Sequence, residues 1–319
     1  MNVSFIIIGL NEGERLRACI RSVHSFARNS EHIKAFEVIY VDSQSVDDSL
    51  QIASQEGATG LLLKGQCNAA RARNYGAKQA KGDILFFIDG DMELNEKAAN
   101  FIFKSPGVLL NPIMNGKRID LFYNNEGDFL YDNESSILNA SKGDEFSITT
   151  GGLFIIDSWL WEKVGGMDNR LMCFEDNDLA YRIFKNTGLR VLKKDVVLAR
   201  HHTVAYTDSL RFKKIVFGKY FYFKGVLYRK HFDSLTILLR LLRSDLSLVI
   251  LLVSILFSFL FLSIYPLFFY FVAQAIKLVF IKKTSERVGY IKRFFYSVLI
   301  DLKILGGISF FYPKENNVD

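Results

Sequence analysis

Two carboxylates one residue apart give the strongest chemical signal in this 319-residue sequence. Asp89-Gly90-Asp91 directly follows the apolar run Ile84–Ile88. Burying two unpaired carboxylates is very costly, so we expect both to emerge where that strand ends. Neighbouring carboxylates can share a hard divalent cation, which would neutralise a diphosphate. A solvated turn has the same residues, so the prediction of a metal site depends on the surrounding motifs.

Acidic and amide side chains also follow the two preceding apolar runs. Asp42 ends the run Phe36–Val41, where a carboxylate can accept the N–H of a uracil or guanine base. The nearby Asp47 fits a helix cap equally well. Asn11-Glu12 follows the first run, although a glutamate at a helix start is also common. These positions form a candidate nucleotide site.

Two arginines begin the predicted helix that leads into the Asp-x-Asp strand. Asn68-Ala69-Ala70 precedes Arg71-Ala72-Arg73, and the small residues allow close packing. The planar guanidinium fork suits phosphate oxygens, so Arg73 is a candidate for binding a diphosphate. The alternative is an ordinary surface arginine on a helix that packs through alanine.

In chain order, these motifs and two later ones resemble family 2 glycosyltransferases with the GT-A fold. The later motifs are Gly151-Gly152 and the run from Glu175 to Arg182, which reads Glu-Asp-x-Asp-Leu-x-x-Arg. The resemblance covers roughly residues 3–205 and lies in the order of the motifs rather than in any one of them. It implies inverting transfer from a nucleotide-diphospho-sugar, with Mn²⁺ or Mg²⁺ held by the Asp-x-Asp motif.

The resemblance also implies a role for each motif residue in binding the donor. Gly9-Leu10-Asn11 departs from the Pro-x-Tyr-Asn of many relatives, so the nucleotide base and the donor sugar stay open. The implied set is Asn11, Glu12 and Asp42 at the nucleoside, Arg73 at the diphosphate, Asp89 at the ribose, sugar or metal, and Asp91 at the metal.

An acidic cluster at a predicted helix start supplies the candidate general base. Inversion by single displacement needs one carboxylate to take the proton of the acceptor hydroxyl. The family resemblance gives that role to Asp176, and Glu175 is the second choice. The alternative is that the cluster only complements the helix dipole. Asp178 and Arg182 are four residues apart and fit a helix-stabilising pair.

Two adjacent histidines end a later strand. Relatives often place a metal-binding histidine here, and imidazole is a reasonable ligand for Mn²⁺. Alternation along a strand lets only one of His201 and His202 face the site. We predict His201, with a purely structural role for both as the alternative.

Alternating apolar runs and amphipathic stretches predict an α/β fold in which a sheet is flanked by helices. Ligands then collect at the carboxyl ends of the strands, where the motifs lie. Residues 105–150 are irregular and polar, and we expect variable loops that shape a substrate cleft. The expected strands are 3–8, 36–41, 60–63, 84–88, 151–156, 189–193 and 196–201; the expected helices are 12–27, 47–56, 68–80, 94–103, 158–164, 176–187 and 209–230.

Charge is divided unevenly along the chain. Residues 1–180 carry 17 basic and 26 acidic side chains, whereas residues 181–319 carry 23 and 8. A basic segment beside an apolar one suits an anionic membrane surface. Zinc-ligand spacing and RNA-binding aromatic motifs are absent from the sequence, so we expect no nucleic acid partner. The three scattered cysteines favour a reducing compartment.

The run from Leu246 to Ile276 contains no charged residue and has basic residues on both sides. It is too long for one straight span and too short for two. The positive-inside rule therefore favours a re-entrant helical hairpin that bends near Tyr265-Pro266 over a tilted single span or a buried core hairpin. Residues 288–312 resemble an interfacial helix.

The predicted organisation has three parts. They are a catalytic domain over 1–207, a basic helical linker over 208–245 and membrane-associated helices over 246–319. The N-terminus lacks the features of a signal peptide, so we expect the catalytic part at the cytoplasmic face of the inner membrane.

The acceptor and two other classes of activity stay open. A membrane segment beside the cleft suggests a lipid-linked glycan as acceptor, with polyprenyl phosphate as the second candidate. A sugar-phosphate nucleotidyltransferase uses a similar metal site, but normally has a glycine-rich loop after the first strand. A non-catalytic membrane-bound scaffold is the third possibility, although every carboxylate that the chemistry needs is present.

Overall fold

A computed structural model describes residues 2–140, 143–205, 209–280 and 290–314. The chain divides into two compact units, one of residues 1–208 with 314–319 and one of residues 209–313. The predicted division at 207 lies next to this boundary. The predicted division at 245 falls inside the second unit, so the basic segment packs with the apolar one instead of linking to it.

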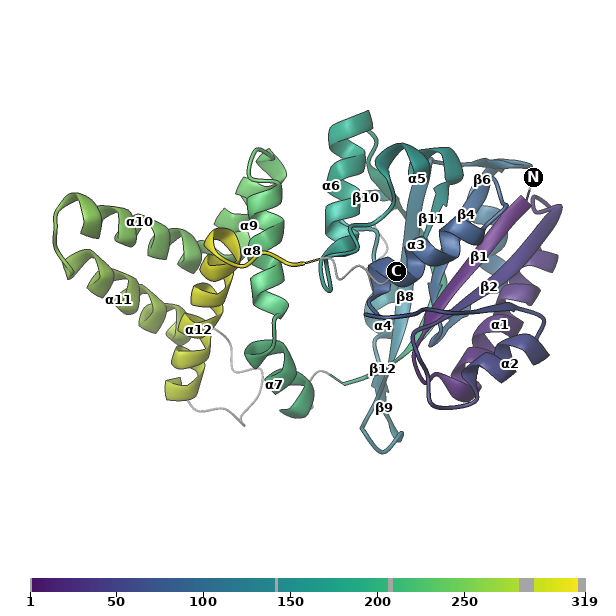
Figure 1. The fold of residues 1–319 in the computed structure, drawn as a ribbon, viewed down its shortest axis with the longest axis horizontal. Helices are drawn as coiled ribbons and strands as arrows, with labels where there is room; N and C mark the ends of the chain where they lie inside the picture. The colour runs from purple at the N-terminus through teal and green to yellow at the C-terminus, as the bar shows by residue number, and fades with distance from the viewer. Residues whose placement is uncertain (1, 141–142, 206–208, 281–289, 315–319) are drawn as a thin grey trace. The chain divides into compact units, whose positions relative to one another are not determined.

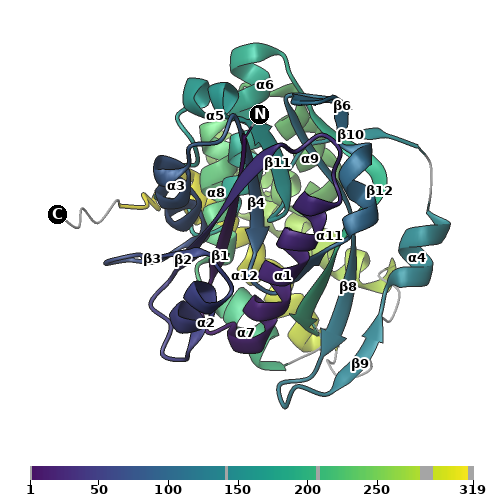
Figure 2. The same ribbon diagram turned by 90° about the vertical axis from the view of Figure 1, so that its right-hand side faces the viewer.

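The N-terminal unit is built on a mixed sheet in the order β10-β12-β8-β11-β4-β1-β2-β3. The strands β3, β2, β1 and β4 are parallel and lie side by side in Figure 2, whereas β11 is antiparallel to β4. The short β5 pairs with β12 and β9 with β8, while β6 and β7 form a separate pair. The bounds are β1 Asn2–Gly9, β2 Ala35–Asp42, β3 Thr59–Leu62, β4 Ile84–Asp89, β5 Met92–Leu94, β6 Phe103–Ser105, β7 Val108–Leu109, β8 Ile113–Tyr123, β9 Phe129–Asp132, β10 Glu145–Ser147, β11 Phe154–Asp157 and β12 Val191–Val204.

Apolar layers cover both faces of this sheet, which is why the first strands are apolar at nearly every position. Phe5 and Ile7 pack beneath α1, whereas the alternate residue Ile6 packs on the other face beneath α3, α5 and α6. Figure 1 shows α1 and α3 on opposite sides of β1. The helix bounds are α1 Gly13–Arg28, α2 Ser49–Gln55, α3 Ala69–Gln79, η1 Glu96–Phe101, α4 Glu134–Asn139, α5 Ser158–Val164 and α6 Glu175–Thr187.

The predicted elements before residue 94 are confirmed to within about two residues, as is the α/β class. Three later predictions for the N-terminal unit are wrong. The helix over 94–103 is a 3₁₀ helix preceded by β5, the two strands over 189–201 are one strand, and the supposed loops of 105–150 contain β8. The strand β8 carries polar residues in its middle and was hidden for that reason.

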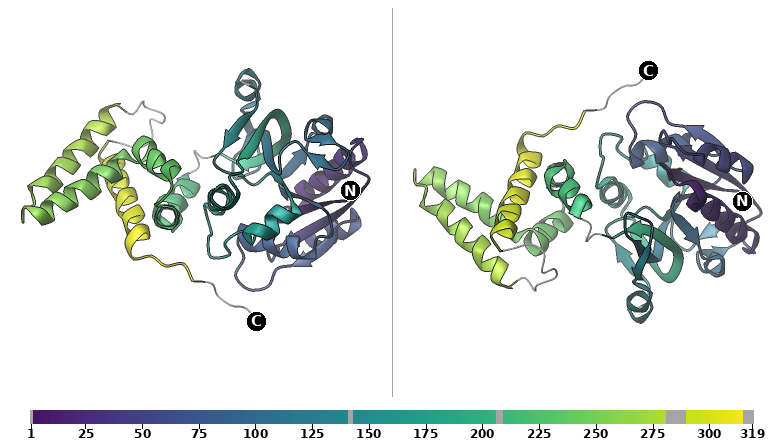
Figure 3. Two further views of the ribbon diagram at one scale, coloured as in Figure 1. Left: turned by 90° about the horizontal axis from the view of Figure 1, so that it is seen from above. Right: turned by 90° about the horizontal axis from the view of Figure 1, so that it is seen from below.

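The C-terminal unit contains only helices among its described residues, and Figure 3 shows α10, α11 and α12 beside one another. The single helix predicted over 209–230 is wrong because α7 ends at Phe217, and Lys303 Nζ donates to the carbonyl oxygens of Val216 and Gly218 at that end (2.7 and 3.0 Å). The bounds are α7 Ser209–Phe217, α8 Tyr220–Lys230, α9 Leu235–Ser244, α10 Leu246–Leu260, α11 Tyr265–Phe280 and α12 Tyr290–Ser309.

The expected bend of the apolar run is present as the turn between α10 and α11, and α12 occupies most of the predicted 288–312 helix. Within the described ranges, no single helix has the length and apolar composition to cross a bilayer. In the same described ranges, α9 and α10 have that length and composition only when taken together, and the two helices are bent by 97° at the break between them. Asp301 and Lys303 of α12 are buried, and the interfacial role expected for residues 288–312 stays a prediction.

Candidate active site

The parallel strands bring the predicted acidic residues to one edge of the sheet. In the register of the strands, Gly9 at the end of β1 pairs with Asp42 of β2, and Ile8 pairs with Asp89 of β4. Glu12 lies between these strand ends: a Cβ atom added to Gly9 would be 2.9 Å from its Cγ atom, and one added to Gly90 would be 3.1 Å away. The two glycines therefore leave the space that Glu12 occupies.

Glu12 is held close to the Asp-x-Asp carboxylates. Burial, followed by the charge of Asp91, raises the pKa of Glu12 to about 7, although Arg15 acts in the opposite direction. A carboxyl group that is costly to ionise beside two other carboxylates marks a place where positive charge would be stabilised.

Asn11 and Asp42 both hold the loop after β2. Tyr40 Oη donates to Asp42 Oδ1 (2.9 Å), and the backbone N–H of Ser45 donates to Asp42 Oδ2 (2.8 Å). Asn11 Oδ1 accepts from the backbone N–H of Val46 (2.8 Å), and Asn11 has a positive φ of 57°. Asp42 is fully buried. Both residues thus shape the loop, and direct base binding by Asp42 stays a prediction.

Asp91 lies beside His201, which comes from β12. The distance from Asp91 Oδ2 to His201 Nε2 is 3.3 Å, and His201 Nδ1 lies 2.8 Å from Asp120 Oδ1 of β8. Burial alone would lower the pKa of His201, but the hydrogen bonds to Asp120 and Asp91 outweigh it and raise the pKa to about 9. Asp120 therefore fixes the imidazole ring with Nε2 directed at Asp91.

His202 faces a different set of partners. Its Nδ1 lies 2.9 Å from Tyr123 Oη, and its Nε2 lies 2.7 Å from Glu93 Oε1. Adjacent residues of a strand point to opposite sides, so only one of the two histidines reaches Asp91. Of the two sequence alternatives, the geometry favours His201 for a metal.

The residues present fit a divalent cation that is bound partly by the protein and partly by a nucleotide diphosphate. Asp91 Oδ1 is buried and has no hydrogen-bond partner among the described residues. A carboxylate that orients a histidine from behind, as Asp120 does, is the usual support of a metal-binding imidazole. Within the described ranges, no three His, Cys, Asp or Glu side chains form a complete metal site. Asp91 and His201 would thus hold a cation together with oxygens of the diphosphate.

Arg73 is buried and forms ion pairs with two of the predicted site residues. Its Nη2 lies 2.8 Å from Asp89 Oδ1, and its Nη1 lies 3.2 Å from Glu175 Oε1. Arg73 is only 3% exposed, so in this conformation it binds protein carboxylates rather than facing a diphosphate. It ties the Asp-x-Asp strand to the start of α6. Arg71 of the same motif keeps part of its surface exposed.

Asp89 needs the glycine that faces it from the turn before β11. A Cβ atom at Gly152 would be 2.1 Å from Asp89 Oδ2, so any larger residue there would displace the Asp89 carboxylate. The Gly-Gly motif therefore has a steric purpose: it lets the Asp89 carboxylate lie between Arg73 and the turn.

Asp176 lies in the first turn of α6 and is partly exposed. Thr149 Oγ1 donates to its Oδ2, and the backbone N–H of Asn177 donates to its Oδ1 (2.8 Å). These bonds fix the direction of the carboxylate. Glu175, the second candidate base, is instead paired with Arg73, and burial raises its pKa. The geometry favours Asp176 as the group that faces an acceptor.

The predicted pair of Asp178 and Arg182 is confirmed, but it is buried rather than solvent-facing. Arg182 Nε lies 2.8 Å from Asp178 Oδ2, and its two terminal nitrogens donate to the carbonyl oxygens of Val164 and Gly166 (both 2.6 Å). This arginine anchors α6 to the end of α5.

Sequence reasoning missed Asp120 and Thr149, which support His201 and Asp176. Both come from the 105–150 region that was read as loops. The alternation of Asp120 with apolar neighbours along β8 was a weak sequence signal that Asp120 lies on a strand. No pattern in the sequence pointed to Thr149.

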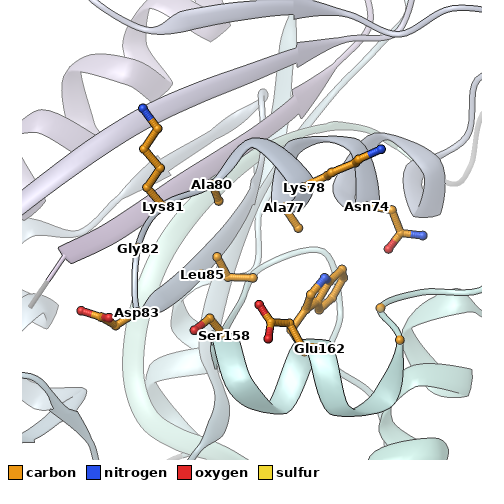
Figure 4. A pocket seen from close by; sticks show the side chains of 13 residues that line it. Asn74, Ala77, Lys78, Ala80, Lys81, Gly82, Asp83, Leu85, Ser158 and Glu162 are labelled. Atoms are coloured by element: carbon orange, nitrogen blue, oxygen red, sulfur yellow. The ribbon is translucent and has the colours of Figure 1, made fainter.

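A separate cavity of about 630 Å³ lies at the other end of β4. Figure 4 shows Lys81, Asp83, Ser158 and Glu162 around it. Asp83 immediately precedes β4, whereas Asp89 ends it. This cavity is therefore distinct from the cluster of acidic strand ends.

Comparison with known proteins connects this site to one family. Residues 4–148 match the family described as Glycosyl transferase family 2. The chain is 32% identical over 106 residues to poly(ribitol-phosphate) beta-N-acetylglucosaminyltransferase TarP of Staphylococcus aureus (strain N315), which covers 32% of each protein. It is 26% identical over 218 residues to polypeptide N-acetylgalactosaminyltransferase 13 of Homo sapiens, over 59% of this chain and 39% of that protein.

The fold also has a solved counterpart. The crystal structure of S. aureus TarS 1–349 in complex with UDP-GlcNAc superposes with a TM-score of 0.50 and 17% identity, over 71% of this chain and 65% of that one. The matches span well under half the length of the two curated relatives. The N-terminal unit of this chain belongs to glycosyl transferase family 2, and its fold is the GT-A fold.

Proposed function

We propose that the protein is an inverting glycosyltransferase that moves a sugar from a nucleotide-diphospho-sugar to a hydroxyl group of a glycan. The observation that carries the proposal is the unsatisfied, buried Asp91 Oδ1 beside a histidine that Asp120 orients, at the ends of the strands. Both curated relatives are named as N-acetylhexosaminyltransferases, so UDP-GlcNAc and UDP-GalNAc are the first donors to test.

Different residues of the site would perform different parts of the transfer reaction. Asp176 takes the proton of the acceptor hydroxyl as its oxygen attacks the anomeric carbon, and Thr149 holds the carboxylate in position. Asp91 and His201 would hold Mn²⁺ or Mg²⁺, which neutralises charge on the departing diphosphate. Arg73 keeps Asp89 and the start of α6 at a fixed separation through its two ion pairs.

The acceptor and the location extend the proposal. An uncharged helical pair with basic flanks supports a lipid-linked glycan acceptor at the cytoplasmic face of the inner membrane. Polyprenyl phosphate is the second acceptor. To distinguish the two acceptors, each is supplied separately in detergent micelles. The labelled lipid product is then identified by mass spectrometry.

The test is a panel of nucleotide-sugars incubated with the purified full-length chain and Mn²⁺. We expect release of a nucleoside diphosphate that is lost in Asp91→Ala and retained in a control, Asp168→Ala, which removes an acidic side chain from its ion pair with the half-exposed Arg170. Formation of a nucleoside triphosphate and a sugar 1-phosphate when pyrophosphate is added would indicate a nucleotidyltransferase, and no reaction with any donor of the panel would indicate a scaffold. Either result would overturn the proposal.

A further inference from the structure

The helical hairpin of α10 and α11 exposes large apolar side chains where it turns. The helices end and begin at Leu260 and Tyr265. Phe259 is 78%, Leu262 92% and Tyr265 85% exposed. An exposed apolar surface of this kind normally marks a binding face.

Polar side chains of the same hairpin are turned inward. Ser247, Ser254 and Gln274 are buried. Tyr270 Oη donates to Asp301 Oδ2 of α12 (3.0 Å), and Gln274 Nε2 donates to the same oxygen (2.5 Å). Water-soluble helices have the opposite arrangement, with apolar side chains inside and polar ones outside. Tyr270, Gln274 and Ser247 thus find their partners inside the helical unit, which is what an apolar solvent favours, although Ser258 Oγ has no partner among the described residues.

Charge is confined to the base of the hairpin. Arg240 and Arg243 precede the uncharged run Leu246–Ile276, and Lys277 follows it. Asp245 is the one acidic residue between 235 and 280, and it is buried in an ion pair with a lysine of α8. Basic residues at the base and apolar residues at the turn match a surface with anionic groups outside and hydrocarbon below.

The length of the hairpin limits how deep it can reach. The 15 residues of α10 extend about 22 Å as a helix, less than a hydrocarbon core of about 30 Å. Because the chain turns back after α10, both ends of the hairpin return to the same side. A cleft of about 410 Å³ between the two helices, lined by Val253, Phe257, Pro266 and Phe269 among others, offers almost no polar partner for water.

From these observations we propose that the hairpin inserts into one leaflet of an anionic phospholipid bilayer. The turn at Phe259–Tyr265 lies deepest, the basic residues of the base contact the headgroups, and a lipid acyl chain lies in the cleft between α10 and α11. The proposal concerns the helical unit alone, so it holds whatever the N-terminal unit transfers.

Binding to vesicles tests the insertion. The full-length chain is incubated with vesicles of phosphatidylcholine, with or without one third phosphatidylglycerol, and the bound fraction is measured by flotation. We expect binding that rises with phosphatidylglycerol and falls with salt. The double variant Phe261→Glu with Leu262→Glu should have an affinity for the vesicles at least about tenfold lower, because charges in hydrocarbon are costly.

A matched control comes from the N-terminal unit. Phe101→Glu with Leu138→Glu also replaces two exposed apolar side chains by carboxylates, but in the N-terminal unit. We expect this variant to bind vesicles as the unaltered chain does. Equal loss in both variants, or no loss in either, would overturn the proposal. A different result is also informative. If the unaltered chain is a dimer that does not bind vesicles, and the hairpin variant is a monomer, a second copy of the chain covers the hairpin and the proposal is wrong.

Depth is measured with tryptophan fluorescence. Both natural tryptophans, Trp159 and Trp161, lie in the N-terminal unit and provide the background to subtract. We expect acyl-chain-brominated phosphatidylcholine to quench Leu262→Trp strongly and Leu246→Trp, at the base, only weakly. Equal quenching at both positions would contradict a turn-first insertion. The assay contains no nucleotide-sugar, so its failure is independent of the proposed transfer reaction.

Discussion

In both units of this protein most buried polar groups have partners, but the two units differ in where they place their large apolar side chains. In the N-terminal unit, apolar strands such as Ile84–Ile88 are buried, and the carboxylates that are buried with them, Asp42 and Asp178, have partners. In the C-terminal unit, the carboxylate of Asp301 is buried and residues such as Leu262 are exposed. Polar groups are placed where they find partners in both units, and the exposed apolar turn of the hairpin is what its proposed insertion into a bilayer requires. The comparison yields the following expectations.

The largest effect is expected at the candidate base. Asp176→Asn keeps the shape of the side chain but cannot accept the proton, so the turnover number should fall by about 10³-fold. Donor binding, measured by titration calorimetry with the intact nucleotide-sugar, should change little. A variant that retains most of its turnover would show that the acidic cluster of α6 serves only the helix dipole.

Arg73 should be the most important buried charge for the stability of the N-terminal unit. Arg73→Met leaves the carboxylates of Glu175 and Asp89 without their partner, and we expect a loss of about 3 kcal/mol in the free energy of unfolding. Arg170→Met removes an exposed ion pair with Asp168 and should cost under about 1 kcal/mol. Chemical denaturation compares them, and equal losses would contradict the burial of Arg73.

Close helix packing should be the sensitive feature of the C-terminal unit. A Cβ atom at Gly307 would be 2.1 Å from the carbonyl oxygen of Tyr222 on α8, so Gly307→Ala should cost about 2 kcal/mol. The neighbouring Gly306→Ala would meet only the movable ring of Tyr222 at 2.9 Å and should be nearly neutral. Thermal unfolding in detergent micelles measures the difference, and the reverse order would contradict the packing of α8 on α12.

The smallest expected effect concerns the orientation of the metal-binding ring. Asp120→Asn should weaken Mn²⁺ binding by about tenfold in the presence of a nucleoside diphosphate, because it removes the carboxylate behind His201. Glu93→Gln, which alters the carboxylate beside His202, should leave the affinity unchanged. Electron paramagnetic resonance of free Mn²⁺ gives both values, and the opposite ranking would assign the metal to His202.

The sequence predicted those parts of the fold that local patterns determine. Continuous apolar runs revealed β1, β2 and β4, and parallel pairing then placed Asp42 and Asp89 at one edge. The strand β8 was missed because Asn115-Gly116-Lys117-Arg118 interrupts its apolar pattern. Gly116 is required there: a Cβ atom would be 2.4 Å from Leu198 Cγ of the neighbouring strand. Tertiary packing, which the local pattern does not contain, determined this element.

The candidate site was predicted as a list of residues but not as a network. The partner of His201 lies 81 residues away, at Asp120, and no spacing rule joins them. The burial of Arg73 could not be predicted for a similar reason, since arginine is usually exposed and burial needs two carboxylates from other elements; its role at the diphosphate stays a prediction. The inward polar side chains of the hairpin likewise depend on α12, which follows it in the chain.

The anomeric configuration of the first hydrolysis product tests the central claim most directly. Without an acceptor, water can attack the donor, and UDP-α-GlcNAc or UDP-α-GalNAc is followed by proton NMR before the free sugar mutarotates. An inverting enzyme yields the β anomer first, together with UDP, and Asp91→Ala yields neither. Initial appearance of the α anomer, or cleavage of the donor to UMP and a sugar 1-phosphate instead of UDP and free sugar, would contradict the account.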